Sequence, residues 1–437
     1  MTNVLEPLDQ TVFDIERATG TANLLQCAWI LPGPVNGPGL ELFHERLRRG
    51  VLVSRRIERS ALPFGRHRWV ASSHASDIEF VSSARPRGEF SDWLNEQPSI
   101  TLDPEHGPGW HLAALPFTDG GSGVSLVISH CLTDGIGLCE SLVSAVGDRD
   151  VGRNWPEAAS RKRSRAIRED LRQVVRDTPA IRRAGAAVLR MGRQKRESAG
   201  STPTLERTGE DEMVDIPRAT ILVDAGDWDS RAEALGGTSN TLLAAFAARL
   251  ASGLGRVTPD GFVTLDMPVN ERTLEDTRAG AVRDAHVTVD PRSATSDLRE
   301  MRAAIKHALV QHKNSVDDEM ALMPLVPLLP QWVVRRMVNF VHGSATRVLS
   351  SNLGAIDESA NRPDGTEADH FAMMWKYPHV TKKLLHQGGG ILALLSGRLH
   401  GSVFVSVFAY QPGHSNDRLP QRLLDTLSEF SLTGAVM

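Results

Sequence analysis

A histidine, an aspartate and a glycine at fixed spacing form the pattern in this sequence with the clearest chemical meaning. His130, Asp134 and Gly135 make up an HxxxDG pattern within the segment SHCLTDG. The pattern follows the apolar run Gly123–His130 and precedes the helix-like run Gly135–Val146. Active residues often lie on a loop that a rigid strand and helix hold in place. The sequence therefore predicts a functional site at this turn.

The three residues suit different tasks. The neutral imidazole of His130 could take a proton from a hydroxyl or an amine and return it to a leaving group. Asp134 is a carboxylate that could fix the turn, and Gly135 suits a place where the backbone packs closely or adopts a positive φ. The alternative interpretation is a turn histidine whose hydrogen bonds are satisfied within the fold. The motif alone does not decide between them.

A cysteine nucleophile is disfavoured beside this histidine. Neighbouring residues of an extended segment point to opposite sides, so the side chains of His130 and Cys131 should diverge. Cys139 lies among leucines in the following helical run, which is ordinary core usage. We therefore expect no covalent thiol catalysis.

Metal and phosphate-loop chemistry also lack support in the sequence. The three cysteines contain no CxxC pair, and the chain has no HExxH and no GK[ST] phosphate loop. His106 and His111 flank Gly107-Pro108-Gly109, so no helix presents them together, and nothing nearby completes a ligand set. We expect no metal and no resident cofactor.

Alternating strand-like and helix-like runs indicate a mixed α/β fold. The predicted strands are Leu24–Leu31, Gly123–His130, Ala219–Ala225, Gly261–Val269, Thr346–Gly354 and two pairing strands within Gly388–Tyr410. The predicted helices are Gly39–Arg49, Gly135–Val146, Thr238–Gly255, Asp297 to about Lys313, and Leu419–Phe430.

A basic segment separates the two halves of the chain. Arginines and lysines crowd the range Arg161–Arg196 among apolar residues, which predicts a surface or connecting helix with a solvated basic face. The functional alternative is a patch for an anionic membrane or for a carrier protein that bears the substrate. The turn-rich stretch Ser198–Glu212 follows. We place the lobe boundary there, giving lobes at 1–205 and 206–437.

Composition narrows the class of protein without naming its chemistry. At roughly 100–200 residues per domain, 437 residues predict two to three domains or two similar lobes. Hydrophobic residues make up 41% and charged residues 23%, as in globular proteins, and a net charge of −4 gives no general attraction to nucleic acid. No apolar run approaches the ~18 residues of a membrane span, and the first residues lack a signal-peptide core. We expect a cytoplasmic protein, with peripheral membrane contact an option for its basic segment.

HxxxDG is the signature of the superfamily that includes chloramphenicol acetyltransferase, peptide-synthetase condensation domains and polyketide-associated acyltransferases. Other segments resemble one branch, the bacterial wax ester synthase/diacylglycerol acyltransferase family. These segments are Pro7-Leu8-Asp9 with Phe13, Pro108-Gly109-Trp110, Gly237-Thr238-Ser239-Asn240, Pro268 with Arg272, and Ser351-Asn352-Leu353-Gly354. The branch usually has two adjacent histidines, and here Ser129 stands in place of the first.

The resemblance implies two chloramphenicol-acetyltransferase-like lobes, each a mixed sheet with flanking helices, and an active-site tunnel between them. His130 would be the general base. Ser351 and Asn352 are the candidate oxyanion donors, although polar residues closing a strand are an equally good interpretation of that segment. Asp134 and Gly135 would shape the site, and Arg272 would pair with Asp134 across the lobe interface.

The implied function is acyl transfer from a thioester, either coenzyme A or a carrier protein, to an alcohol or amine, with an O-acyltransferase favoured. The thioester is a substrate, so the reaction needs no cofactor. One alternative is an amide-forming condensation enzyme that acts on carrier proteins. Another is a lipid- or metabolite-binding protein of the same fold without turnover.

Overall fold

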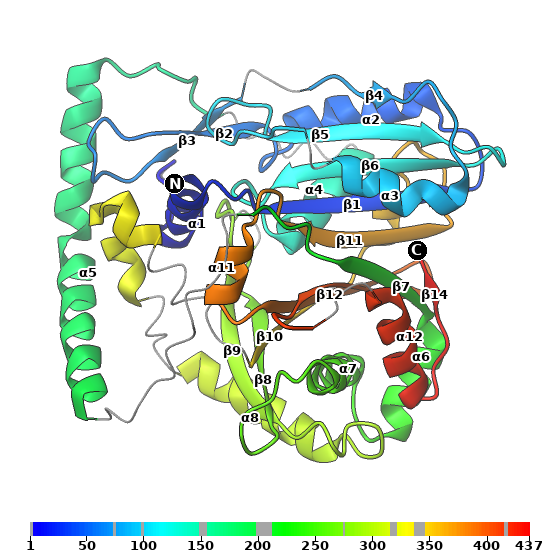
Figure 1. The fold of residues 1–437 in the computed structure, drawn as a ribbon. Helices are drawn as coiled ribbons and strands as arrows, with labels where there is room; N and C mark the ends of the chain where they lie inside the picture. The colour runs from blue at the N-terminus through cyan, green and yellow to red at the C-terminus, as the bar shows by residue number, and fades with distance from the viewer. Residues whose placement is uncertain are drawn as a thin grey trace.

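The computed structural model describes residues 3–72, 76–97, 100–147, 155–197, 212–273, 276–314, 321–335, 346–414 and 418–437, and for residues 189–197 and 313–314 it describes the backbone only. Two sheets lie one above the other, each with helices packed against it (Figure 1). The chain thus has the mixed α/β, two-lobed architecture that the sequence predicts.

The sheet of the first lobe has the strand order β11-β1-β6-β5-β4 and is mixed, because β4 and β5 are parallel while the other pairs are antiparallel. Its strands are β1 (Leu24–Leu31), β4 (Glu79–Phe80), β5 (Trp110–Pro116), β6 (Ser122–Ser129) and β11 (His370–Lys376). Around it lie α1 (Pro7–Thr19), α2 (Gly37–Arg49), η1 (Arg87–Glu89), α3 (Phe90–Glu96), α4 (Gly135–Val146) and the hairpin of β2 (Arg55–Glu58) with β3 (Arg68–Ala71).

Helices cover this sheet on both faces. Trp29 of β1 packs against Phe43 of α2, with ring centroids 6.4 Å apart. Gln26 of the same strand donates from Nε2 to the carbonyl oxygen of Leu94 in α3. Residues of opposite parity in a strand point to opposite faces, so α2 and α3 lie on different sides. The complete burial of β1 and β6 follows from this arrangement.

The sheet of the second lobe has the order β14-β7-β13-β12-β10-β8-β9. Its strands are β7 (Arg218–Asp224), β8 (Val263–Asn270), β9 (Val282–Val289), β10 (Arg347–Ala355), β12 (Ile391–Leu399), β13 (Ser402–Tyr410) and β14 (Ala435–Val436). The flanking elements are α6 (Ala225–Ala234), α7 (Ser239–Gly253), α8 (Arg299–Asn314), α11 (Lys382–Gln387) and α12 (Leu419–Glu429). By contrast, η3 (Met323–Leu328) packs against α1 and α5 (Arg163–Glu197), and η4 (Glu358–Asn361) packs against α4 of the first lobe. The buried alanines and leucines of α7 form part of this lobe's core.

The predicted strands and helices are present. β1 and α4 have the predicted bounds, and β12 pairs with β13. The helix α2 begins two residues early because the Asn36 side chain accepts a hydrogen bond from Gly39 N and caps it.

The second half of the chain also contributes to the first sheet. β11 pairs along β1, so a strand from residues 370–376 forms one edge of the sheet that carries β6. The predicted lobe boundary near residue 205 lies outside the described residues. β11 comes after that boundary in the chain but belongs to the first sheet. Cutting the chain near residue 205 would therefore not separate the two sheets.

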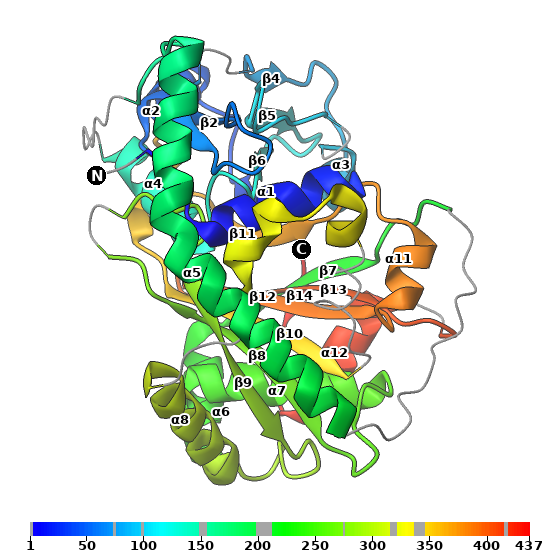
Figure 2. The same cartoon turned by 90° about the vertical axis from the view of Figure 1, so that its left-hand side faces the viewer.

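The basic segment forms one long helix, α5 (Arg163–Glu197), which runs along both lobes (Figures 1 and 2). Arg161, just before it, is bound to Glu58 of β2 at 3.1 Å and to Asp170 of α5 itself at 3.0 Å. Arg168, Arg172 and Arg176 are exposed. The segment is therefore a connecting helix with a solvated basic face over the part whose side chains are described.

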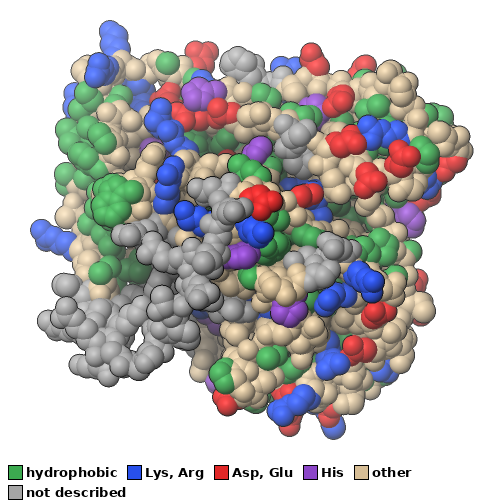
Figure 3. Space-filling model, in the orientation of Figure 1, with side chains coloured by type: hydrophobic (Ala, Val, Ile, Leu, Met, Phe, Trp, Pro, Cys, Tyr) green, Lys and Arg blue, Asp and Glu red, His purple; other side chains and the backbone are tan. Residues whose placement is uncertain are grey.

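Acidic and basic side chains are mixed over the face shown in Figure 3. Within the described residues, no helix is both long enough and apolar enough to cross a membrane.

Candidate active site

The predicted turn joins β6 to α4 as expected. The β6 ladder continues for one residue, because His130 N donates to the carbonyl oxygen of Asn23 at 2.8 Å. Asp134 is the N-cap of α4, and its Oδ1 accepts from Gly137 N at 2.7 Å. His130 is half-buried, whereas the residues from Cys131 to Asp134 are buried. His130 is thus the residue of this turn, before α4 begins, that stays partly exposed to solvent.

The surroundings of His130 favour the neutral ring. Burial lowers the pKa of the imidazole from its ordinary value, while a hydrogen bond to its own backbone and the charge of Asp134 oppose the decrease. A ring that is neutral at physiological pH can accept a proton. The histidine is therefore in the protonation state that a general base requires.

Asp134 holds the two lobes together. Its Oδ2 accepts from Arg272 Nη2 at 2.8 Å and from Ala281 N at 2.8 Å. The side chains of Asp134 and Arg272 are 5% and 1% exposed. The guanidinium also donates to the carbonyl oxygens of Ala279 and Arg278. The predicted pairing of Asp134 with Arg272 across the lobe interface is therefore confirmed.

The segment that carries Arg272 connects β8 to β9 and is held under the first lobe at further points. Asp9 of α1 accepts from Ala279 N at 3.0 Å and from Gly280 N at 2.9 Å. Arg55, fully buried against Trp69, donates to the carbonyl oxygens of Thr277 and Leu132. We call the described residues of this connection, 271–273 and 276–281, the latch loop. It joins the second lobe to the turn that carries His130.

Asp9 is itself buried, and burial raises the pKa of its carboxyl to about 6 even though the two backbone N–H groups and Arg55 lower it. Sequence reasoning noted Asp9 only within a family resemblance, and it missed Arg55. A buried arginine in a short strand has no distinguishing sequence pattern.

Two glycines allow close packing at the start of α4. A Cβ on Gly135 would lie 2.8 Å from Leu353 Cδ2, and a Cβ on Gly137 would lie 3.0 Å from Arg272 Cζ. The close packing predicted at Gly135 is therefore present. It also brings the Ser351–Gly354 segment of β10 against the HxxxDG turn.

The two candidate oxyanion donors on β10 face different ways. Ser351 is in register with Leu395 of β12, a member of the first lobe's core, whereas Ser350 is in register with Leu394, a member of the second lobe's core. Because adjacent residues alternate, Ser351 faces the first lobe. Asn352 instead donates from Nδ2 to Asn240 Oδ1 at 3.1 Å, and its Oδ1 accepts from Gly354 N.

Cys131 points away from the histidine, as the alternation predicts. Its Sγ donates to Glu16 Oε2 at 3.2 Å, and burial raises the pKa of the thiol well above its usual value. A buried neutral thiol that donates to a carboxylate is a poor nucleophile.

No protein-family model and no curated protein sequence matches this chain. Solved structures do match it in fold. The first condensation domain of the CDA synthetase has a TM-score of 0.58 and 12% identity, covering 100% of this chain and 99% of its own. The wax ester synthase/diacylglycerol acyltransferase from Marinobacter aquaeolei VT8 has a TM-score of 0.56 and 15% identity, covering 99% of each chain.

A third match is the polyketide synthase associated protein 5 from Mycobacterium tuberculosis, with a TM-score of 0.55 and 14% identity over 96% of this chain and 95% of that one. These likenesses show a shared fold over nearly the full length. The chain therefore has the two-lobed fold of condensation domains and wax ester synthases, as its resemblance implies.

Replacing Asp134 by Asn should destabilise the protein through loss of the ion pair. Asn remains a good helix N-cap, so the cap survives while Arg272 loses its counter-charge. Removal of one partner of a buried pair costs about 3–5 kcal/mol of unfolding free energy, which urea denaturation would measure.

Asp224→Asn is the matched control, because Asp224 caps α6 from an exposed position. Its unfolding free energy should change by less than about 0.5 kcal/mol. An Asp134→Asn protein that is as stable as the parent but inactive would contradict the structural role and place this carboxylate in the chemistry.

Proposed function

We propose that the protein is an acyltransferase that moves an acyl group from a thioester to an alcohol or an amine, with His130 as the general base. The observation that supports this proposal is that Asp134 of HxxxDG is committed to structural contacts whereas His130 is not. Both oxygens of Asp134 are occupied by Gly137 N, Arg272 and Ala281 N. His130 is half-buried and its pKa is lowered, so the ring is available to a substrate proton.

The reaction follows from these groups. The acceptor O–H or N–H attacks the thioester carbonyl carbon while its proton moves to the ring nitrogen of His130 that is not bonded to the residue's own backbone. Collapse of the tetrahedral intermediate breaks the C–S bond, and the proton passes from the imidazolium to the departing thiolate. A thiol has an ordinary pKa of about 8.5, so it leaves readily. Acyl ester or amide and free thiol are the products.

The negative charge that develops on the carbonyl oxygen needs a donor. Ser351 is the better placed of the two candidates, since it faces the first lobe and lies two residues from Leu353, which contacts Gly135. Asn352 has its amide committed to Asn240 and Gly354, and acts by holding the end of β10. The tunnel that would bring donor and acceptor to His130 stays a prediction.

An amide-forming condensation enzyme is the second candidate, because the same fold occurs in a condensation domain with equal coverage. A binding protein without turnover would lack acceptor-dependent thiol release. Assays that supply the acyl group on coenzyme A or on a carrier protein, with alcohol or amine acceptors, would distinguish the three.

His130→Ala should lower kcat/KM by a factor of about 10²–10⁴, the usual contribution of a general base. Because the pKa of His130 is lowered by burial, the wild-type kcat/KM should decrease on acidification only at a lower pH than an ordinary imidazole would require. His307→Ala, at an exposed position of α8, is the control. If His130→Ala kept activity within a few-fold of the parent, the mechanism would be wrong.

Ser351→Ala should lower kcat by roughly 10²-fold while KM changes little, since an oxyanion donor acts in the transition state. Ser350→Ala is the matched control because Ser350 faces the other lobe, and its activity should stay within a few-fold of the parent. A large kcat loss in Asn352→Ala with none in Ser351→Ala would reverse the assignment of the donor.

The exposed basic face of α5 supports an acidic carrier protein as the source of the acyl group. Arg168, Arg172 and Arg176 are exposed on successive turns. Arg161 is excluded from this surface, because it is 15% exposed and paired with Glu58 and Asp170. Nothing in the structure supports a membrane contact for this face.

Reversing Arg168, Arg172 and Arg176 to Glu should weaken carrier binding by about tenfold, at about 0.5 kcal/mol for each surface charge pair. The wild-type affinity should fall between 0.1 and 1 M salt, as the Debye length shortens from about 10 Å to about 3 Å. Turnover of a small free thioester should be unchanged.

The control reverses Arg302 and Lys306 on α8, in the other lobe. Titration of fluorescently labelled carrier would measure both sets. Equal carrier affinity in the two variants would leave α5 as a connecting helix only.

A further inference from the structure

A cavity lies where α1, the connection from β2 to β3 and the segment around η3 meet. α1 and η3 lie side by side (Figures 1 and 2). The volume of the cavity is about 330 Å³. Arg59 contributes to its lining and has a side chain that is 52% exposed, so the cavity reaches the surface. No residue of the HxxxDG turn lines it, so it is separate from the proposed catalytic site.

A histidine and an aspartate of this lining face each other without being hydrogen-bonded. His67 Nε2 lies 3.8 Å from Asp14 Oδ1, which is too far for a hydrogen bond. The other ring nitrogen, Nδ1, accepts from Ser60 N at 3.3 Å, so the neutral ring carries its proton on Nε2. A donor on His67 and an acceptor on Asp14 are therefore close together with a gap between them.

The surroundings define the charges of both groups. Burial raises the pKa of the Asp14 carboxyl to about 6, although a hydrogen bond from Gln10 and the charge of Arg17 lower it. Burial, followed by the charges of Arg17 and Arg59, lowers the pKa of His67 to about 4. Near pH 8, Asp14 is therefore ionised and His67 is neutral, so the carboxylate accepts hydrogen bonds and Nε2–H donates one.

The remaining charges near the cavity are balanced. Arg17 and Arg59, which are always protonated, both pair with Glu105. Two guanidinium groups thus accompany two carboxylates, those of Asp14 and Glu105. Balanced charges give a cation or an anion no general advantage, so the cavity favours a neutral ligand.

A hydroxyl group matches the gap between Asp14 and His67. Its single oxygen carries one donor and two acceptor positions, so it can donate to Asp14 Oδ1 and accept from His67 Nε2 at once. An ammonium group has no acceptor, and an ether oxygen has no donor. The hydroxyl is therefore the simplest neutral group that satisfies both side chains.

The cavity also has an apolar side. The apolar lining residues are Leu62, Pro63, Val326, Pro327, Leu329 and Val334. Val326 and Val334 pack with Ala18 of α1, which holds this wall in place. A water molecule occupies about 30 Å³ and needs several polar partners, so a cavity of about 330 Å³ with an apolar wall suits a molecule with a hydrocarbon part better than water alone.

From this arrangement we infer that the cavity between α1, the connection from β2 to β3 and the η3 segment binds a small neutral alcohol, with the hydroxyl bridging Asp14 and His67 and the hydrocarbon part lying against Val326 and Leu329. The inference goes beyond acyl transfer at His130 and does not depend on it.

Isothermal titration of the full chain near pH 8 with hexanol tests this binding. Methyl pentyl ether is the probe of equal size without a donor, hexylammonium is the cationic probe, and methanol is the hydroxyl without a hydrocarbon part. Hexanol should bind saturably. The ether should bind at least about tenfold more weakly, because it leaves the Asp14 carboxylate without a donor. Hexylammonium and methanol should also bind more weakly than hexanol.

Two variants locate the site. Asp14→Asn keeps the size of the side chain and removes its charge, and His67→Asn keeps an acceptor for Ser60 N while removing the Nε2 donor. Each should weaken hexanol binding by about fivefold or more. The controls are Glu41→Gln on α2 and His307→Asn on α8, which change exposed side chains and should bind hexanol like the parent.

An absence of hexanol binding would overturn the inference. Ether or hexylammonium binding as tight as that of hexanol would overturn it as well, because the hydroxyl would not be what is recognised. Unchanged hexanol affinity in both folded variants would place the alcohol elsewhere, with the same consequence. Should both variants fail to fold, the preference of the wild-type chain for hexanol over the ether, hexylammonium and methanol decides the question.

Discussion

The buried ion pair between Asp134 and Arg272 is the contact on which the arrangement of this molecule depends. One carboxylate caps α4, pairs with a guanidinium from the second lobe and accepts from the backbone of Ala281. Burial of charge is tolerable only because every oxygen of the carboxylate has a donor. The latch loop is held in place further by Asp9 and Arg55. The lobes therefore meet at the turn that presents His130.

This constraint also defines the chemistry that the turn can perform. The carboxylate of Asp134 is committed to Arg272 and does not orient the imidazole by a hydrogen bond as the aspartate of a serine-hydrolase triad does, although its charge raises the pKa of the ring. The basicity of His130 is set mainly by burial, which keeps the ring neutral. Ser351 comes from the opposite lobe. A site divided in this way is complete only when the lobes are docked.

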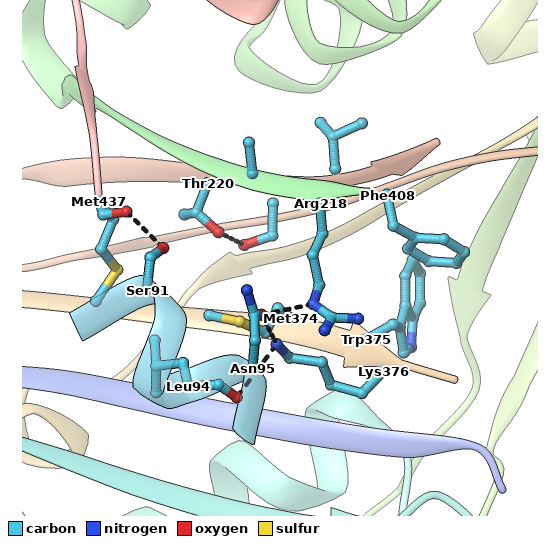
Figure 4. A pocket seen from close by; sticks show the side chains of 13 residues that line it. Ser91, Leu94, Asn95, Arg218, Thr220, Met374, Trp375, Lys376, Phe408 and Met437 are labelled. Carbon is cyan, nitrogen blue, oxygen red and sulfur yellow. Dashed lines mark hydrogen bonds between the residues drawn. The ribbon is translucent and has the colours of Figure 1, made fainter. Parts of the chain in front are cut away.

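β11 links the two lobes in a second way, because it follows β10 of the second sheet in the chain but pairs with β1 of the first. Its pairing with β1 places Lys376 in the first sheet and beside Arg218 of the second. The lobe interface thus contains two polar clusters, one around Asp134 and one around Lys376, which differ in their charges. At Asp134 the buried charges are balanced, whereas at Lys376 two basic side chains, Lys376 and Arg218, donate to the amide oxygen of Asn95 (Figure 4). The balanced cluster stabilises the fold.

The local elements and the position of the proposed base, His130, could be predicted from contiguous stretches of the sequence. The eight buried residues of β1 form one uninterrupted, mainly apolar run, and Asp134 directly precedes α4. Both signals lie within short segments, so both elements have the predicted bounds. The pairing of β11 with β1, the contacts of Arg55 and the different directions of Ser351 and Asn352 became evident only in the folded structure. These features join residues that are tens to hundreds of positions apart, and periodicity within a segment carries no information about which distant segment completes its hydrogen bonds.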